Sequence, residues 1–534
     1  MNALFFTQSS SLDMFYNLML AMKKSISLEK IGFYVADSKF FKEFKQEYPE
    51  IESNSYLILK EWEIIRDSKD IKRDLSLLEQ YEKEIGQPYL WNALVADRRI
   101  YFGKKYAYDQ DYKPRFSHER MLSILQEGLK RIEVFFDEIQ PSFIVSFQCN
   151  TIGDYLSYLF ARARNIPILN LRPTRIRNYF YCGETVMEPS DHLQEMYEQF
   201  LKYGIDTSLK DEAAKYLQQV QKAHAMYEGV VLSSNKPPGM VNSKKKPFNL
   251  LKLKSLLDLL IGEYKFRFGE YRDDNHISSY IGHFVGQRII RPWRARMMER
   301  RFRNLYVRSK DLPLLNYAFF PLHTEPEVTL SVYSKPYRNQ IEAARLFSHN
   351  LPIGMKLVVK EHPWAIGRRP LSYYLKLMEI PNVLLAHPGL NSRELASHAR
   401  LITVIAGSVG LEGSMLKKPA IVLGQTPYNF LPNSMIRYAE NPERLGYEIQ
   451  DLLENYEYNE AALLSYISAV MNNSVSIDFY SRLLRRPGVY RENQQQADID
   501  EDKERQNQIE RLAKYLINRY NIFVSASSNL SNIE

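Results

Sequence analysis

Short apolar runs alternate with helical patterns through the first third of this chain. The runs at residues 3–6, 31–35, 143–147 and 166–171 predict buried strands. Apolar positions three or four residues apart predict helices at residues 13–23, 38–48, 122–138 and 154–164. This alternation is typical of a parallel sheet with helices on both faces, so we expect an α/β domain here.

The same alternation returns more clearly after residue 316. Strands are predicted at residues 317–322, 355–360, 383–386, 401–405 and 420–423. Helices are predicted between them at residues 337–349, 371–378, 393–398 and 409–417. This order predicts a second α/β domain, a doubly wound sheet of about five strands.

The segment between these domains is helical and charged, with a loop signal, SSNKPPG, at residues 233–239. We interpret it as a connector or lid. The predicted organisation is an N-terminal Rossmann-like domain over 1–190, a helical basic connector over 191–310, a second Rossmann-like domain over 311–440, and C-terminal helices with a tail over 441–534. Residues 494–508 are rich in Gln, Asp, Glu and Lys and are expected to be disordered, and residues 525–534 to form a loose tail.

The composition is that of an ordinary globular protein, with 45% hydrophobic and 25% charged residues. Cys149 and Cys182 are the only cysteines, which excludes a disulfide framework and favours a reducing cytosol. No apolar run reaches the roughly 18 residues that span a bilayer, and the N-terminus lacks the basic region of a secretory signal. We therefore expect a cytoplasmic protein, soluble or peripheral at the inner face of the cytoplasmic membrane.

The net charge of +8 is concentrated in two places. Residues 284–310 contain nine cations against the single acid Glu299, namely Arg288, Arg291, Arg294, Arg296, Arg300, Arg301, Arg303, Arg308 and Lys310. A second cluster consists of Lys244, Lys245, Lys246, Lys252 and Lys254. Such clusters are either solvated helix faces or sites for nucleic acid, anionic lipid or acidic glycan. We favour an anionic partner, but not nucleic acid, because interleaved aromatic residues and known nucleic-acid modules are missing.

Polar residues follow three predicted strands of the second domain, where open α/β sheets bind ligands. The first group contains Lys360, His362 and Pro363. Pro363 ends the strand sharply and restricts the residue before it, which fixes the direction of His362. A His beside a Lys at this edge can bind a phosphate or diphosphate. The alternative is a structural histidine.

The second group reads AGSVGLE at residues 406–412. Small residues let a ligand approach the backbone, and a helix that begins near Ser408 offers N–H groups to an anion. Glu412, one turn into this helix, is placed to accept hydrogen bonds from ribose hydroxyls. Tight helix–strand packing is the alternative explanation of the glycines. The segment matches neither the dinucleotide fingerprint nor the Walker loop, so NAD and a P-loop are excluded.

The third group lies in a proline-rich loop and contains His323, Glu325 and Glu327. An imidazole and two carboxylates in a loop that faces the interdomain cleft can orient a sugar or act as acid or base. A plain turn is equally consistent with the prolines.

The second domain contains four motifs, in this order along the chain: FFPLHTEPE at residues 319–327, VVKEHP at 358–363, GSVGLE at 407–412 and KPAIVLG at 418–424. Together they resemble the capsule polysaccharide biosynthesis family, which includes the Kdo transferases of capsule export systems. The resemblance covers about residues 310–435. It implies a GT-B fold, with an N-terminal acceptor domain and a C-terminal nucleotide-sugar domain. The implied activity is that of a glycosyltransferase that extends a capsular or lipopolysaccharide-type glycan, or its lipid-linked acceptor.

The resemblance also implies roles for single residues. His362 would contact the donor phosphate, Ser408 and Gly410 the phosphate or nucleotide, and Glu412 the ribose, while Gly424 and Tyr428 would border the base or sugar. The neighbouring motif residues Lys360, Pro363, Gly407 and Val409 complete the expected binding site. One departure is Val404, which stands where many retaining glycosyltransferases carry a carboxylate eight residues before the glutamate, so the stereochemistry stays open.

Sugar transfer requires stabilisation of the departing phosphate and a positioned acceptor hydroxyl. We assign the first task to His362 and the helix start at Ser408. Asp13 and Asp154 are candidates for the base beside His323 and Glu325, and helix capping is the alternative for both aspartates. The sequence shows no metal motif, so we expect transfer without metal or cofactor, from a CMP- or UDP-linked donor.

Other functions fit the same fold. A polymerase of the teichoic-acid type would transfer a polyol phosphate from a CDP-linked donor, and a non-hydrolysing sugar epimerase shares the architecture. A non-catalytic scaffold that docks a polymer at the membrane through residues 284–310 is the alternative from another class.

Overall fold

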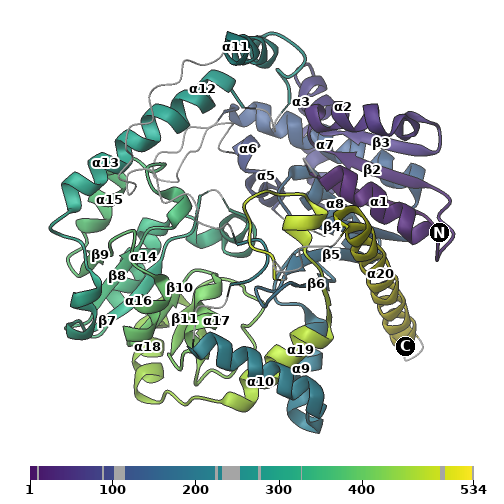
Figure 1. Ribbon diagram of the computed structural model, residues 1–534. Coiled ribbons are helices and arrows are strands. Elements are labelled where there is room, and N and C mark those ends of the chain that lie inside the picture. Colours follow the sequence, from purple (N-terminus) through teal and green to yellow (C-terminus); the bar gives the residue numbers. More distant parts are fainter. Residues whose placement is uncertain are drawn as a thin grey trace.

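The structure is a computed structural model that describes residues 1–8, 11–86, 89–101, 115–222, 226–230, 253–274, 278–325, 327–492 and 500–531. The lysine cluster at 244–246 with Lys252, the side chain of Lys254, the predicted loop at 233–239, Pro326 and residues 494–499 lie outside the described part. The described chain forms two α/β lobes that face each other, as Figure 1 shows in purple-blue and green.

The N-terminal lobe is built on a seven-stranded sheet in the order β13-β6-β5-β4-β1-β2-β3. Its strands are β1 (Ala3–Thr7), β2 (Ile31–Val35), β3 (Tyr56–Lys60), β4 (Phe143–Phe147), β5 (Ile168–Pro173), β6 (Tyr179–Gly183) and β13 (Ser474–Ser476). Strands β1 to β5 are parallel, whereas β6 and β13 pair antiparallel at one edge. Its helices include α1 (Ser11–Lys23), α2 (Ser38–Glu47), α3 (Glu61–Asp67), α4 (Leu75–Glu84), α5 (Trp91–Ala96), α6 (Arg98–Tyr101), α7 (His118–Ile139) and α8 (Ile152–Ala163).

The C-terminal lobe contains a six-stranded, fully parallel sheet in the order β12-β11-β10-β7-β8-β9. Its strands are β7 (Tyr317–Pro321), β8 (Lys356–Lys360), β9 (Val383–Leu385), β10 (Leu401–Val404), β11 (Ala420–Val422) and β12 (Ile436–Tyr438). Its helices are α14 (Gln340–Asn350), α15 (Leu371–Met378), α16 (Ser392–His398), α17 (Ser408–Met415) and α18 (Leu445–Glu454). This strand order is that of the Rossmann fold, and the predicted fold class, two Rossmann-type domains facing a cleft as in GT-B proteins, is confirmed.

Burial explains why the sequence pattern located these strands. The inner strands β1, β4 and β10 are buried along their whole length, because helices cover both faces of a parallel sheet. Continuous apolar runs are therefore required there. Strand β12 of the C-terminal sheet was not predicted, because it has only three residues, of which Arg437 and Tyr438 are only half-buried.

The C-terminal part of the chain returns to the N-terminal lobe. Helix α20 (Glu501–Ser531) packs along α1, and its residues Ile509, Leu512 and Leu516 are buried in the core of that lobe. The expected disorder at 494–508 is therefore wrong for residues 501–508. The expected loose tail is likewise wrong as far as Ser531, because the helix continues to that residue.

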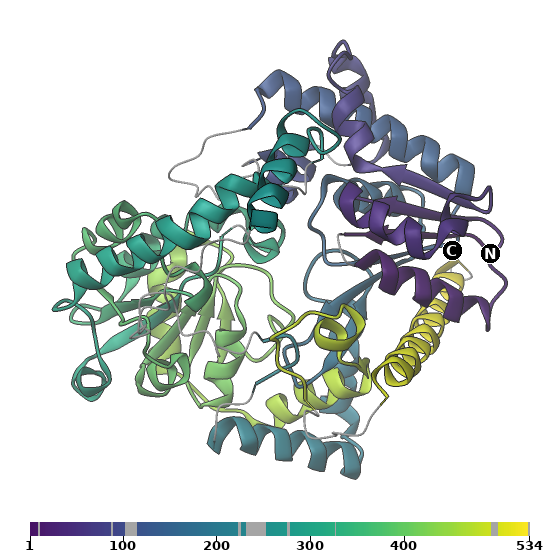
Figure 2. The ribbon, with the colours of Figure 1, turned by 45° about the horizontal axis from the view of Figure 1, so that its top comes forward.

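The predicted connector separates into two parts. Helices α9 (Asp191–Tyr203) and α10 (Thr207–Lys222) pack with α19 (Glu460–Asn472) in one buried cluster beside the C-terminal sheet. The second part bridges the lobes on another side of the molecule (Figure 2). It consists of α11 (Leu253–Arg267), α12 (Tyr280–Val285), η3 (Gly286–Ile290) and α13 (Arg291–Phe302), which together we call the arch.

The arch is attached to both lobes. At one end, Asp273 forms an ion pair with Lys69, and Asp274 Oδ2 accepts a hydrogen bond of 2.7 Å from the backbone N–H of Ser38. At the other end, Arg291 Nε donates to the carbonyl oxygen of Ile366 at 3.0 Å. No helix within the described residues is long and apolar enough to cross a membrane.

Candidate active site

A pocket of about 550 Å³ lies between the two lobes. Its walls come from the carboxyl ends of β4 and β5 in one sheet and of β7, β8, β10 and β11 in the other. Strands β7 and β10 are neighbours in the sheet although they are not consecutive in the chain, so the order of the C-terminal sheet reverses between them. A crevice at such a switch point is where doubly wound sheets bind ligands, and the volume is in the range of small-molecule sites.

The start of helix α17 forms part of the pocket wall. Gly407 occupies the N-cap and has no side chain with which to cap the helix, so the N–H groups of the first turn are exposed to a ligand from the pocket. The Ser408 hydroxyl donates to Glu412 Oε1 at 3.0 Å, which places both side chains together on this wall. The Tyr428 hydroxyl donates to the Gly407 carbonyl oxygen and so holds the loop before helix α17 in place.

His362 follows strand β8 and lines the pocket in its neutral form. Burial lowers its pKa to about 4, although Glu327 and Glu361 oppose the shift. Its Nδ1 accepts a hydrogen bond of 3.2 Å from the backbone N–H of Trp364, so the Nε2 atom carries the proton. Lys360 also lines the pocket, and burial lowers the pKa of its ammonium group to about 8. This wall therefore offers a neutral N–H donor and a cation to an anionic ligand.

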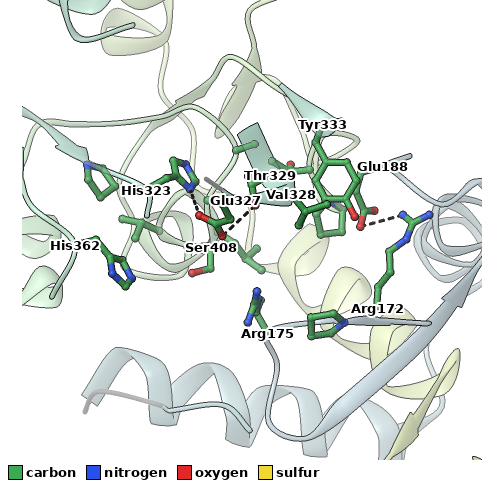
Figure 3. Close-up of a pocket in the computed structure, with 18 of the residues that line it drawn as sticks. Arg172, Arg175, Glu188, His323, Glu327, Val328, Thr329, Tyr333, His362 and Ser408 are labelled. Carbon is green, nitrogen blue, oxygen red and sulfur yellow. Dashed lines mark hydrogen bonds and ion pairs between the residues drawn. The ribbon is translucent and has the colours of Figure 1, made fainter. Parts of the chain in front are cut away.

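His323 and Glu327 form a second polar group beside the first (Figure 3). His323 Nδ1 lies 3.3 Å from Glu327 Oε2, and Thr329 Oγ1 donates to Glu327 Oε1 at 3.2 Å. Burial alone would raise the pKa of Glu327, but the interactions with His323, His362 and Arg175 outweigh it and lower that pKa to about 2. Glu327 is thus a carboxylate that holds the ring of His323.

The N-terminal lobe contributes residues that the sequence analysis did not single out. Arg175 has a left-handed backbone, with φ of 64°, and its side chain points across the pocket toward Ser408 and Glu327 (Figure 3). The Arg175 guanidinium carbon lies 5.2 Å from the centre of the Tyr227 ring. Burial disfavours its charge, but nearby tyrosines and Glu327 raise its pKa, so it stays cationic. No sequence motif marks this residue, because its loop meets the C-terminal lobe only in the folded chain.

A buried ion pair forms part of the N-terminal wall of the pocket, and a buried charge cluster lies behind the C-terminal wall. Arg172 and Glu188 form an ion pair at 3.0 Å, with side chains 2% and 6% exposed. Glu325 is directed away from the pocket and forms an ion pair of 3.2 Å with the fully buried Arg369. The predicted catalytic role of Glu325 therefore does not agree with its position. Glu325 therefore faces Arg369, whereas His323 and Glu327 of the same loop line the pocket.

Neither candidate aspartate reaches the pocket. Asp13 lies beside Arg505 of α20, with which it forms an ion pair. Asp154 completes a capping box with Thr151 at the start of α8, is 3% exposed, and has its pKa raised by burial to about 7. The alternative of helix capping holds for Asp154.

Two of the predicted glycines serve packing. A Cβ atom on Gly410 would lie 2.6 Å from the Tyr428 hydroxyl oxygen, and one on Gly424 would overlap the Ser334 hydroxyl. Neither residue lines the pocket, whereas all other predicted binding residues do: Lys360, His362, Pro363, Gly407, Ser408, Val409, Glu412 and Tyr428. In the part of the chain that the structure describes, no three His, Cys, Asp or Glu side chains form a group able to hold a metal ion.

Comparison with known proteins finds a match for the part of the chain that forms the C-terminal wall of the pocket. Residues 261–432 match the model of a family described as capsule polysaccharide biosynthesis protein. This segment covers α13 and the strands from β7 to β11, and therefore the whole C-terminal wall of the pocket. The resemblance drawn from the four motifs, which covers about residues 310–435, is confirmed by this match.

No curated protein matches the chain in sequence. Among solved structures, KpsC β-Kdo 2,4 transferase of Thermosulfurimonas dismutans is 14% identical, with a TM-score of 0.33, over 69% of this chain and 96% of that one. The β-Kdo 2,7 transferase of the same KpsC is 10% identical, with a TM-score of 0.32, over 71% and 87%. UDP-GlcNAc 2-epimerase of Neisseria meningitidis is 11% identical, with a TM-score of 0.22, over 88% and 98%.

Proposed function

We propose that this chain is a glycosyltransferase that transfers a sugar from a nucleotide-sugar donor to a growing bacterial surface polysaccharide or to its lipid-linked acceptor. The main observation in support is that the start of helix α17, His362 and Lys360 lie on one wall of the pocket between two Rossmann-like lobes. The match of residues 261–432 to the model of the capsule polysaccharide biosynthesis family supports the same function.

The donor phosphate or diphosphate binds at Gly407 and Ser408. There the helix N–H groups, the Nε2–H of His362 and the ammonium of Lys360 stabilise the charge that develops on the leaving phosphate. The nucleotide extends toward Glu412, whose carboxylate accepts hydrogen bonds from ribose hydroxyls. Because His362 is neutral near pH 7, it acts as a hydrogen-bond donor rather than as a counter-ion.

The acceptor enters from the N-terminal lobe. As its hydroxyl oxygen forms a bond to the anomeric carbon, the bond from that carbon to the phosphate oxygen breaks, and the hydroxyl proton passes to His323. Glu327 orients the imidazole and stabilises its protonated form. Arg175, on the acceptor side, favours an acceptor that carries an anionic group close to the reacting hydroxyl.

Donor binding is tested by thermal shift and calorimetry with CMP-, UDP-, GDP- and CDP-linked donors. We expect one nucleotide class to bind the wild type, and His362→Ala and Glu412→Ala to lose that binding. Tyr447→Ala, an exposed change in the same lobe, is the control and should bind normally. Stabilisation by a CDP-polyol alone would assign the chain to polyol-phosphate transfer instead. No response to any nucleotide would refute the proposal.

Proton transfer is tested with Glu327→Gln. This variant keeps the shape of the side chain but removes the charge that holds His323, so we expect kcat to fall by about 10²-fold or more with donor affinity unchanged. Glu342→Gln, an exposed change on α14, is the control and should leave kcat unchanged. A normal kcat in Glu327→Gln would exclude the His323–Glu327 pair as the base.

A further inference from the structure

Helix α11 in the arch exposes apolar side chains along one face. Leu256, Leu257, Leu260, Ile261 and Tyr264, with Phe268 just past the helix end, have exposed fractions between 43% and 73%. Their spacing of one, four, five, eight and twelve residues places them on one side of the helix. A surface helix of a globular protein normally turns this face inward. Contiguous exposed apolar surface is typical of a docking site.

The orientation of α11 is fixed by its opposite face. Gly262 packs against the ring of Tyr280 on α12, where an added Cβ atom would lie 2.6 Å from the ring. Glu263 is buried and accepts hydrogen bonds from Ser279 Oγ at 2.9 Å and from the backbone N–H of Ile281 at 3.1 Å. The apolar residues are therefore held outward by contacts within the arch.

The other half of the arch exposes cations beside apolar and aromatic side chains. Five arginines are exposed and have no acidic partner among the described residues, namely Arg288, Arg296, Arg300, Arg301 and Arg303. Ile289, Ile290 and Trp293 lie among them with exposed fractions of 59%, 39% and 59%. Arg291 and Arg294 differ, because they donate to backbone carbonyls of the C-terminal lobe and so hold α13 in place.

We propose that the arch docks the protein on an anionic lipid bilayer. The apolar face of α11 enters the boundary between headgroups and acyl chains, Trp293 lies at the headgroup level, and the exposed arginines of α13 contact lipid phosphates. Arginine and tryptophan beside aliphatic side chains are typical of interfacial helices. A nucleic acid would not need five exposed aliphatic and aromatic residues on α11 with Phe268 beside them, and a free anionic sugar would not need them either.

This inference does not depend on the proposed reaction. It does hold both lobes that form the pocket at the membrane, because the arch is bound to each of them. A protein held in this way acts on substrates that remain at the membrane.

The test is co-sedimentation with vesicles of phosphatidylcholine alone and of phosphatidylcholine with phosphatidylglycerol. We expect binding to the anionic vesicles that weakens as salt rises. The triple changes Arg296→Ser/Arg300→Ser/Arg301→Ser and Leu257→Ser/Leu260→Ser/Ile261→Ser should each lower the partition coefficient at least tenfold. Circular dichroism and melting temperature should match the wild type, because all six side chains are exposed.

Matched controls lie elsewhere on the surface. Arg345→Ser/Arg485→Ser removes two exposed arginines outside the arch, and Ile353→Ser/Tyr447→Ser removes two exposed apolar side chains. Both should bind vesicles like the wild type. Failure of the wild type to bind anionic vesicles, or equal loss in the controls, overturns the proposal. A dimer in ultracentrifugation that the α11 variant dissociates, without vesicle binding, would assign the apolar face to a second copy of the chain instead.

Discussion

The buried charge cluster beneath the pocket provides the sharpest stability prediction. Arg369 is fully buried, forms ion pairs with Glu361 and Glu325, and donates to the carbonyl oxygen of His323 at 2.5 Å. Burial disfavours the charge on Arg369, but Glu361, Tyr373 and Glu325 outweigh it and raise its pKa. Replacing Arg369 with Met keeps most of the side-chain volume and removes the charge that compensates both carboxylates.

The size of the effect follows from the two carboxylates that stay buried after Arg369 is replaced. The side chain of Glu361 is 0% exposed and that of Glu325 is 6% exposed, so neither carboxylate can recover its hydration in the variant. Breaking a buried pair by removing one partner costs about 3–5 kcal/mol. We expect Arg369→Met to lower the free energy of unfolding by this amount, which is a large part of the roughly 5–15 kcal/mol that stabilises a typical protein.

Urea unfolding followed by circular dichroism measures this change. The control Arg345→Met removes a solvent-exposed partner of Glu342, with side chains 45% and 55% exposed, and should change stability by less than about 1 kcal/mol. Adding Glu361→Gln to Arg369→Met should restore part of the loss, because it removes one of the uncompensated charges. A loss below about 1 kcal/mol in Arg369→Met would refute the reasoning. No gain on adding Glu361→Gln would show that Glu361 is not the source of the penalty.

Three further predictions concern other buried groups. The imidazole of His362 should titrate near pH 4 by NMR, and because the unfolded chain binds this proton more readily, His362 should destabilise the fold as pH falls from about 6.5 toward 4; a titration near 6.5 would contradict its burial. Gly424→Ala should cost about 1–3 kcal/mol in urea unfolding, because its methyl group would overlap Ser334, whereas Gly286→Ala, with open space around it, should not destabilise. Both cysteine thiols are buried with raised pKa values, so a thiol reagent should label them only after unfolding, and fast labelling of the native protein would disprove this burial.

The C-terminal wall of the pocket was largely predictable from local sequence. Strands β7, β8 and β10 are short apolar runs that end in polar or small residues, and parallel strands bring their carboxyl ends to one edge. The sequence therefore suffices to place His362, Ser408 and Glu412 together at one sheet edge. This prediction depended on the spacing of apolar residues and on the polar residues at the strand ends. Both are visible in a short stretch of sequence.

Residues that depend on long-range packing could not be predicted in this way. Glu325 and Glu327 are two residues apart in one loop, yet one is buried against Arg369 and the other faces the pocket. Arg175 enters the site because its loop meets the opposite lobe, and Asp13 is excluded because α20 returns to cover it.

The sequence alone determined the two α/β lobes, the parallel inner strands of their sheets, and the sheet edge that carries His362 and Ser408, because burial on both faces and helix starts leave local patterns. The edge strands β3, β6 and β13 of the N-terminal sheet were not predicted. Only the tertiary structure decided which carboxylates face the pocket, that the C-terminal helix belongs to the N-terminal lobe, and that α11 turns its apolar face outward. A helical period shows that one face of α11 is apolar, but only the contacts of Gly262 and Glu263 on the other face fix which side is exposed.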